Sequence, residues 1–480
     1  MPEVEKKINN YEINFIRLRG LNDQVLLTTD QGGWAILDQE DYNKMLKYEI
    51  SGEIYNDLLS KGIILTPESI SSVIGNYKKR VQYFFGGTTL HLIIATTRCN
   101  QKCIYCHSNA TNPFLNSEIL NKDTADRIID FIFQSPSPQL HIEFQGGESL
   151  LNFDMVKYVV EEVNHINKKK NKKIKFDLVS NLTLLTDEMI EYIAENKIGV
   201  CTSLDGPKFV HDANRKFING SETYDAVTRS IKKMSVRNIS VGMLMVTTRY
   251  SLPYWKEIVD EYLKFGGDKI RFKFLDYLGF AKSEWDHIGY TVEEFVEFWK
   301  KAVDYIFELN KKGVLIIESN VELILQKLYG QIDPNFLDLR SPCGMIIGQL
   351  AYNYNGDIYT CDEGRSDKYY VLGNVMKDNY KEIIKSKRTK EFVSSSIIEN
   401  YLCDACVYKP FCGLCPVLSR SENNSLFTVL ARDNHCKIFK FIFDYVFDKI
   451  TNDFETLKKV FLGFKLKRLL ESSINKNRLV

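Results

Sequence analysis

The sequence predicts an α/β protein built around a partial (β/α)6 barrel. Six apolar, strand-like runs alternate with helical segments, as expected for a parallel sheet covered by helices. Polar or glycine-rich residues follow most of these runs, at the carboxyl ends where parallel barrels place their active sites. The predicted strands are residues 90–97, 139–146, 174–181, 199–206, 240–247 and 269–277.

The composition excludes several other classes of protein. The 480 residues carry a formal net charge of +1, so we expect no nucleic-acid or membrane partner on electrostatic grounds. No apolar run is long enough for a transmembrane helix, and the stretch MPEVEKKINNYEINF lacks the apolar core of a secretory signal. We therefore expect a cytoplasmic protein.

The pattern of elements divides the chain into five parts. The runs QVLLTT and GGWAIL, followed by two helical segments, predict a small α+β domain at the amino terminus. The last part is predicted to be helical with a basic, solvated end. The expected boundaries are 1–88 for the α+β domain, 89–315 for the barrel, 316–342 for a helical bridge, 343–436 for a cysteine-rich, strand-poor domain and 437–480 for the helical tail.

Eleven cysteines in a reducing compartment predict metal ligands rather than disulfides. Cys99, Cys103 and Cys106 lie in CNQKCIYC, directly after the first predicted strand, with no fourth cysteine nearby. A structural zinc site takes four ligands. A cubane iron–sulfur cluster held by three thiolates would instead leave one iron open for a small molecule. A partial zinc site is the alternative for these three cysteines. The solitary Cys201, by contrast, is predicted to be a buried structural thiol.

The motif Cys-x3-Cys-aromatic-x-Cys at the end of a first barrel strand resembles the radical S-adenosylmethionine (SAM) superfamily. The resemblance implies that SAM chelates the open iron and is cleaved to a 5′-deoxyadenosyl radical by an electron from the cluster. Further family motifs follow in order at later strand ends. By resemblance, the residues that contact SAM are Tyr105, Gly146, Gly147, Glu148, Ser180, Asn181, Ser203 and Arg215.

Each of these residues has an expected role by resemblance. Ser180, Asn181 and Ser203 contact the SAM ribose or carboxylate. Gly146 and Gly147 allow the backbone to approach the ligand closely, and the Glu148 carboxylate accepts hydrogen bonds from the SAM ammonium group. Arg215 pairs with the SAM carboxylate through its planar guanidinium, and Tyr105 flanks the adenine. Taken singly, each fits a turn or a cap as well. Their order at successive strand ends carries the prediction.

The second group of cysteines, which includes CDACVYKPFCGLC, resembles the SPASM extension of radical SAM peptide maturases, which carries two auxiliary clusters. A structural zinc ribbon is the alternative, although a ribbon does not need the additional cysteines upstream and downstream. The resemblance gives three [4Fe–4S] clusters in all. It assigns Cys403, Cys406, Cys412 and Cys436 to one auxiliary cluster, and Cys343, Cys361 and Cys415 to the other.

Two features of the cysteine-rich domain matter for chemistry. The family's eighth cysteine, expected shortly before Cys343, is absent, so the inner auxiliary cluster has an open iron or a non-cysteine ligand such as Asp338. Asp362 corresponds to an aspartate that deprotonates the substrate in sulfatase-maturing relatives, and it is our candidate catalytic base. A turn-forming aspartate is the alternative, and Glu363 or Arg365 would contact a substrate peptide.

The chain as a whole resembles the B-type maturase of the His-Xaa-Ser peptide system, on stretches that include TLHLIIATTRCNQKCIYC and CVYKPFCGLCPV. This implies an oxidoreductase that cross-links or otherwise oxidises a ribosomally synthesised precursor peptide and takes electrons from a flavodoxin or ferredoxin. A formylglycine-generating sulfatase maturase and a non-catalytic iron–sulfur electron carrier are the alternatives. The amino-terminal domain is expected to recognise a leader peptide or to cap the barrel.

Overall fold

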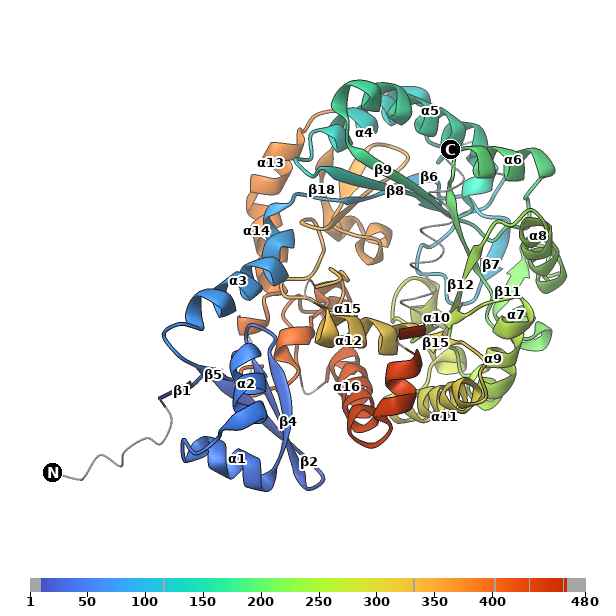
Figure 1. The fold of residues 1–480 in the computed structure, drawn as a ribbon. Coiled ribbons are helices and arrows are strands. Elements are labelled where there is room, and N and C mark those ends of the chain that lie inside the picture. Colours follow the sequence, from blue (N-terminus) through green and yellow to red (C-terminus); the bar gives the residue numbers. More distant parts are fainter. Residues whose placement is uncertain are drawn as a thin grey trace, which may run out of the picture.

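The centre of the molecule is a curved, mostly parallel sheet (Figure 1). The computed structural model describes residues 10–114, 117–330, 333–400, 403–430, 432–460 and 462–463. Each barrel strand pairs in parallel with the next one along the chain. These strands are β6 (Leu90–Thr96), β8 (Gln139–Gly146), β9 (Lys173–Val179), β10 (Gly199–Ser203), β12 (Val241–Val246) and β14 (Phe272–Lys273). The predicted α/β partial barrel is confirmed.

The last barrel strand is shorter than predicted. Residues 269–277 form two short pieces instead of one strand: β13 (Lys269–Ile270) pairs with β15 (Ile317–Glu318), and β14 pairs with β12. Ile270 and Phe272 are both fully buried, so the apolar period continues through the break. Arg271, between the two pieces, faces the cavities described below.

Helices cover the outer side of the barrel sheet (Figure 1). They are α4 (Lys122–Phe133), α5 (Phe153–Lys170), α6 (Asp187–Glu195), α7 (Lys208–Asn214), α8 (Tyr224–Val236) and α9 (Trp255–Lys264). The sequence fixes several helix starts, because Asn121 caps α4 and Thr186 caps α6 through their side-chain oxygens. Fully buried residues such as Ile128, Val156 and Ile190 pack these helices against the sheet.

Three long helices enclose a second apolar core. They are α11 (Val292–Lys311), α12 (Ser319–Tyr329) and α16 (Asn434–Asn452), and the shorter α10 (Phe280–Ile288) precedes them. A capping box between Thr291 and Glu294 begins α11, where the sequence shows its clearest amphipathic period. The predicted basic end of the chain, from residue 464, lies outside the described residues.

The cysteine-rich domain adds strands to the barrel sheet, contrary to the strand-poor prediction. Its strands are β16 (Gln349–Tyr352), β17 (Asp357–Tyr359) and β18 (Val371–Asn374), and its helices are α13 (Tyr380–Lys385), α14 (Lys387–Ser395) and α15 (Pro416–Asn423). Strand β16 pairs in parallel with β6, so one sheet runs through both domains. A turn at Asn353–Gly356, with Gly356 at φ +84, joins β16 to β17.

The amino-terminal domain is a three-stranded antiparallel sheet followed by helices. Its elements are β1 (Glu12–Ile13), β2 (Ile16–Leu21), β3 (Gln24–Thr29), β4 (Trp34–Asp38), α1 (Gln39–Leu46), α2 (Gly52–Ser60), β5 (Ile64–Leu65) and α3 (Ile70–Val81). The domain packs against the cysteine-rich region. The Thr28 hydroxyl donates to the Val407 carbonyl at 2.7 Å, and Arg17 Nε donates to the Asp404 carbonyl at 2.7 Å. Among the described helices, none has the length and apolar character needed to cross a bilayer.

Candidate iron–sulfur and S-adenosylmethionine site

The first cysteine loop follows β6 and is held by a small antiparallel pair of strands. Strand β7 (Gln101–Cys103) pairs with β11 (Arg215–Phe217), and the register places Arg215 opposite Cys103. Arg215 Nη1 lies 3.7 Å from the Cys103 sulfur. A residue more than a hundred positions away is therefore fixed beside a predicted cluster ligand.

A cavity of about 460 Å³ opens at the carboxyl ends of the barrel strands. This is the space where the sequence predicted a ligand site. The predicted residues that line it are Cys99, Cys103, Tyr105, Cys106, Gly146, Gly147, Ser180, Asn181, Ser203 and Arg215. The structure thus brings together all the predicted SAM contacts except Glu148.

The two glycines after β8 occupy positions without room for a side chain. A Cβ atom on Gly146 would lie 2.2 Å from the Thr96 carbonyl oxygen, and one on Gly147 would lie 2.3 Å from the Arg98 carbonyl oxygen. Gly147 N donates to the Thr96 carbonyl at 2.9 Å, which joins the loops after β6 and β8. The close approach of these two loops is what requires glycine.

Glu148 lies behind the cavity wall rather than in it. Its carboxylate is fully buried and accepts hydrogen bonds from the Ser180 hydroxyl at 2.6 Å, from Asn181 N at 2.7 Å and from Leu150 N at 3.0 Å. Burial raises the pKa of this carboxyl, and the hydrogen bonds act in the opposite direction. In this arrangement Glu148 positions the loop after β9, which differs from the ammonium contact expected from the sequence.

Asp205 is a residue of this site that the sequence reasoning missed. Its carboxylate accepts hydrogen bonds from the Tyr105 hydroxyl at 2.6 Å and from Arg215 Nε at 3.0 Å. Burial opposes the charge on Arg215, but Asp205 keeps the pKa of the guanidinium above its usual value. The Arg215 guanidinium lies 5.0 Å from the centre of the Tyr105 ring. Asp205 therefore orients two predicted SAM contacts at once.

The cysteine spacing does not match a site for a single zinc ion. Among the described residues, which include all eleven cysteines, no three sulfur atoms lie within 4.8 Å of one another. Thiolates around one zinc ion would be roughly 3.8 Å apart, given Zn–S bonds of about 2.3 Å in a tetrahedron. Among the described residues, no set of three or more cysteines therefore has the spacing of a zinc site, and the zinc alternatives gain no support.

Four cysteines of the cysteine-rich domain surround a small closed pocket. Cys403, Cys406, Cys412 and Cys436 line a space of about 40 Å³ together with apolar residues that include Ile398, Leu414 and Phe443. Burial raises the pKa of Cys403 to about 11, and it also raises the pKa of Cys412 and Cys436. Asp433 caps α16 and fixes Cys436 at its first turn. This is the outer cysteine set.

Three other cysteines form the inner cysteine set. Cys343 and Cys361 are buried, and Cys415 lines a second cavity, of about 480 Å³. Burial is the main cause of a raised pKa in all three thiols. Cys343 also raises the pKa of Cys361 and of Cys415, and Cys361 raises the pKa of Cys415. Gly364 N donates to the Cys361 sulfur at 3.3 Å. The carboxyl groups of Asp338 and Glu363 line the same cavity.

The two large cavities adjoin, because they share part of their walls. The shared lining residues are Glu143, Gln145, Leu244, Arg271, Lys273, Phe274, Asp276 and Asp362. Asp362 Oδ1 accepts from Arg365 Nε at 2.6 Å, and His107 Nε2 lies 3.6 Å from Asp362 Oδ2. Burial alone would raise the pKa of Asp362, yet Arg365 and His107 outweigh it and lower the pKa. Asp362 is therefore a carboxylate on the wall between the 460 Å³ cavity of the first cysteine loop and the 480 Å³ cavity of the inner cysteine set.

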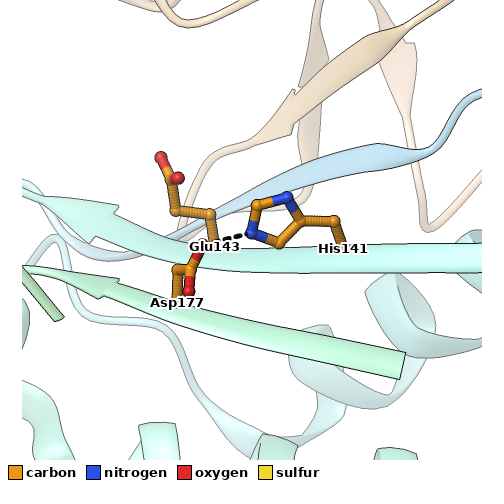
Figure 2. A group of neighbouring side chains, drawn as sticks. All are labelled: His141, Glu143 and Asp177. Atoms are coloured by element: carbon orange, nitrogen blue, oxygen red, sulfur yellow. Dashed lines mark hydrogen bonds and ion pairs between the residues drawn. The ribbon is translucent and has the colours of Figure 1, made fainter. Parts of the chain in front are cut away.

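The barrel interior also carries a hydrogen-bonded group deeper along the strands (Figure 2). His141 and Glu143 lie on β8, and Asp177 lies opposite Glu143 on β9. The three side chains offer ligand atoms within 4.8 Å of one another. His141 Nε2 lies 2.6 Å from Asp177 Oδ2, and Lys175 Nζ lies 2.5 Å from the same oxygen. Because the lysine ammonium already supplies the positive charge, we interpret this group as a hydrogen-bonded network without a metal ion.

The prediction that Cys201 is a buried core thiol was wrong. Cys201 is only partly buried, and its side chain lines the 460 Å³ cavity with Ser203. Alternate residues of a strand face the same side of a sheet. Cys201 and Ser203 on β10 therefore both point into the barrel.

Comparison with known proteins agrees with this geometry. A model of the radical SAM superfamily matches residues 93–265, and a model of the SPASM iron–sulfur cluster-binding domain matches residues 343–407. The first range begins within β6 and ends just after α9, and the second begins at Cys343 and includes Cys406. Both predicted domains are therefore found.

Two relatives match most of their own length. A cysteine-type anaerobic sulfatase-maturating enzyme of Clostridium perfringens is 26% identical over 379 residues, which cover 76% of this chain and 97% of the relative. An uncharacterized protein of Methanocaldococcus jannaschii is 30% identical over 319 residues, which cover 65% of this chain and 97% of the relative.

The fold extends to a solved structure that spans nearly the whole chain. The crystal structure of Streptococcus suis SuiB bound to the precursor peptide SuiA superimposes with a TM-score of 0.55 at 16% identity, covering 89% of this chain and 100% of that one. At this identity the likeness shows the fold alone. Together with the two matched domains and the cysteine-lined cavity, it leads to one conclusion: the chain belongs to the radical SAM superfamily and carries a SPASM domain behind its barrel.

Proposed function

We propose that this radical SAM enzyme oxidises a ribosomally synthesised peptide by removing hydrogen from one of its residues. The observation that carries the proposal is a shared wall between two cavities: the 460 Å³ cavity lined by the predicted SAM contacts, called the SAM cavity below, and the 480 Å³ cavity of the inner cysteine set. A peptide side chain in this space would lie between a hydrogen-abstracting site and an electron acceptor. The likeness to SuiB, which was crystallised with a precursor peptide, supports a peptide as substrate.

The residues take defined parts in this proposal. Cys99, Cys103 and Cys106 hold a cluster, and the surrounding cavity holds SAM beside Arg215. When bound, this pair supplies a carbon-centred radical that takes a hydrogen atom from the substrate. The outer and inner cysteine sets hold two auxiliary clusters, and a low-potential donor such as flavodoxin or ferredoxin supplies the reducing electron. A cavity of about 460 Å³ beside the first cysteine loop argues against a mere electron carrier, which needs no such space.

Asp362 is the proposed base for the proton that the substrate releases with its second electron. The Arg365 guanidinium and His107 hold its pKa low despite burial, so the carboxylate is ionised at neutral pH and available as an acceptor. Asp362→Asn should reduce peptide modification far more than it reduces SAM cleavage. Equal losses in the two assays would assign Asp362 a structural role.

The decisive experiment uses the anaerobically reconstituted protein with dithionite and SAM. It should form 5′-deoxyadenosine, and Cys103→Ala should abolish this product. Co-expression with a small open reading frame that neighbours the gene, followed by mass measurement, should show a peptide that has lost two hydrogens. A His-Xaa-Ser precursor is the expected substrate. A peptide of unchanged mass despite normal deoxyadenosine formation would contradict an oxidation.

Formylglycine generation is the second candidate function. The relative from Clostridium perfringens and the position of Asp362 favour it. A synthetic peptide with one central cysteine distinguishes the two reactions. An aldehyde product that reacts with a hydrazide would support sulfatase maturation, and recovery of the unmodified thiol would exclude it.

We propose that the amino-terminal domain acts as a cap. Support comes from its hydrogen bonds to the loop of the outer cysteine set, from Thr28 and Arg17 to Val407 and Asp404. Recognition of a leader peptide is the other prediction. Deletion of residues 1–85 tests both: weaker peptide binding with intact iron content supports recognition, and loss of iron from the outer cysteine set supports the cap.

A further inference from the structure

The ribbon of β7 and β11, which lies beside α7 in Figure 1, has two different faces. The register pairs Cys103 with Arg215 and Lys102 with Lys216, so the two pairs point to opposite sides of the ribbon. Arg215 is buried and its Nη1 lies 3.7 Å from the Cys103 sulfur, whereas both lysines are exposed. The inner face therefore holds a predicted cluster ligand, and the outer face presents two ammonium groups to solvent.

The two lysines form an arrangement that stability alone does not favour. Side chains directly opposite one another in an antiparallel pair are about 5 Å apart at Cβ, and like charges there are destabilising. Within the part of the chain that the structure describes, neither the Lys102 nor the Lys216 ammonium has a hydrogen bond or an ion pair. Glu222, which forms an isolated bridge with Lys216, pairs instead with Lys208 at 3.0 Å. The outer face thus keeps two positive charges without a described counter-charge.

The position of this face beside Cys103 suggests a use for the two charges. Lys102 directly precedes Cys103 on β7, so the backbone of one strand separates the outer face from the cysteine sulfur. Cys103 and Arg215 line the SAM cavity from the inner face. A protein that rests on the outer face would therefore come close to the first cysteine loop and leave the SAM cavity free.

The chemistry of the outer face fits a transient partner with an acidic surface. Ile218, 40% exposed, follows β11, and its backbone N donates to the Asn100 carbonyl at 3.1 Å, which holds it beside the cysteine loop. The face therefore combines a small apolar contact with two positive charges. Redox partners form small, short-lived complexes, and complementary charges raise the rate at which they meet. Because the whole chain has a net charge of only +1, attraction of an acidic protein depends on local groups of this kind.

We propose that the outer face of the β7–β11 ribbon is the docking surface for a low-potential electron-donor protein with an acidic surface. The proposal rests on the proposed function, in which a donor of this kind reduces the cluster of the first cysteine loop. Lys102 and Lys216 attract acidic side chains of the donor, and Ile218 supplies the apolar contact. The donor is oxidised by one electron, which passes across the strand that carries Cys103 and reduces the cluster there.

The outer cysteine set is the competing point of entry for the electron. Lys437 is exposed at the start of α16, directly after Cys436. The ribbon is favoured because Cys103 belongs to the cysteine set that lines the SAM cavity, whereas Cys436 lines the small outer pocket. An electron that enters at the ribbon reaches the site of SAM cleavage directly.

The test compares two reductants on the full-length, reconstituted enzyme. Formation of 5′-deoxyadenosine is measured with dithionite, which needs no docking surface, and with a reduced flavodoxin whose surface is acidic. Lys102→Glu combined with Lys216→Glu should lower kcat/KM for flavodoxin by about tenfold and remove its sensitivity to salt, because the charges no longer complement each other. The iron content and the dithionite reaction should stay at the wild-type level. Lys102→Arg combined with Lys216→Arg should keep the flavodoxin reaction.

Lys168→Glu combined with Lys170→Glu is the matched control. It makes the same change in net charge at the exposed end of α5, which leads into the start of β9 at the opposite end of the barrel strands. This control should behave like the wild type with both reductants.

Four results would overturn the docking surface. They are an equal loss in the control, a loss with Lys437→Glu but not with the ribbon variant, an equal loss with dithionite in the ribbon variant, and a wild-type enzyme that flavodoxin does not reduce. Failure of the proposed function looks different, because the wild-type enzyme would then form no 5′-deoxyadenosine even with dithionite.

Discussion

The cysteine loop after β6 and the outer cysteine set place the same ligand chemistry in opposite surroundings. Cys99, Cys103 and Cys106 face a cavity of about 460 Å³ lined by glycine, hydroxyl, amide and guanidinium groups. The outer four cysteines surround about 40 Å³, which is closed by mostly apolar side chains together with Lys409 and Lys440. The open loop lacks one thiol and has room for a ligand, whereas the outer set has four thiols and no such room. Ligand number and free volume therefore change together, as expected if one site binds a substrate and the other only conducts electrons.

The largest expected difference between the two regions is in SAM cleavage. Cys103→Ala should remove about four irons per chain and reduce 5′-deoxyadenosine formation to background, because the open cluster is the site of cleavage. Cys406→Ala should also remove about four irons while leaving dithionite-driven cleavage measurable. Iron analysis and chromatography of the nucleoside products check both. Background cleavage in Cys406→Ala would show that the outer set is not a separate electron-transfer site.

The next largest effect concerns the buried network that supports the open site. Asp205→Asn leaves the Arg215 guanidinium buried without its counter-charge, and breaking such a pair costs about 3 kcal/mol of unfolding free energy. The KM for SAM should rise by about tenfold, because Arg215 and Tyr105 lose the acceptor that orients them. Chemical denaturation and SAM kinetics measure the two effects.

The control for this prediction is Asp225→Asn on α8. Asp225 forms an exposed ion pair with Lys208, and exposed pairs contribute little to stability. Both the stability and the KM for SAM should therefore stay close to wild type. If Asp205→Asn behaves like this control, Asp205 does not position the SAM contacts.

Sequence reasoning predicted the architecture and most of the open site because those signals are contiguous. Each barrel strand is an apolar run, and the predicted polar groups stand at the ends of those runs. Period-two alternation would also have placed Cys201 beside Ser203, and treating it as a core residue ignored that rule. Asp205 was missed because an aspartate in SLDGP is indistinguishable from a turn residue until Tyr105 and Arg215 are folded onto it.

The remaining differences arise from contacts between segments far apart in sequence. Strands β16 to β18 are too short to predict from periodicity alone, although the NYNG turn between LAY and DIY was a usable signal. The role of Glu148 depends on the loop after β9, which contributes Ser180 and Asn181 as its donors. Such pairings are set by tertiary structure and leave no local pattern.

A smaller effect is expected from removing a hydrogen bond by which the amino-terminal domain supports the loop of the outer cysteine set. The Thr28 hydroxyl, fully buried in the amino-terminal domain, donates to the Val407 carbonyl between Cys406 and Cys412. Thr28→Val leaves that carbonyl without its donor and should cost about 1–2 kcal/mol of stability. Iron should be lost from the outer site faster under a chelator, with SAM cleavage unchanged. Ser60→Ala, which removes an exposed hydroxyl of the same domain, is the control. Equal chelation rates in the two variants would refute the role of the cap.

The smallest effect concerns the sheet that joins the barrel to the cysteine-rich domain, and it is measured as the pH dependence of stability. His91 on β6 is fully buried and lies 2.8 Å from the Tyr352 hydroxyl on β16. Burial lowers the pKa of His91 from 6.5 to about 3, so the native protein keeps it neutral while the unfolded chain takes up a proton. The free energy of unfolding is therefore unaffected by His91 well above pH 6.5. As the pH falls toward 3, proton uptake by the unfolded chain lowers it, by about 1 kcal/mol between pH 6.5 and 5.5. His91→Gln should remove this part of the acid dependence, measured anaerobically as the shift in urea midpoint between those two pH values. Exposed His165→Gln should retain it, and an identical shift in both variants would mean that His91 is protonated in the native sheet.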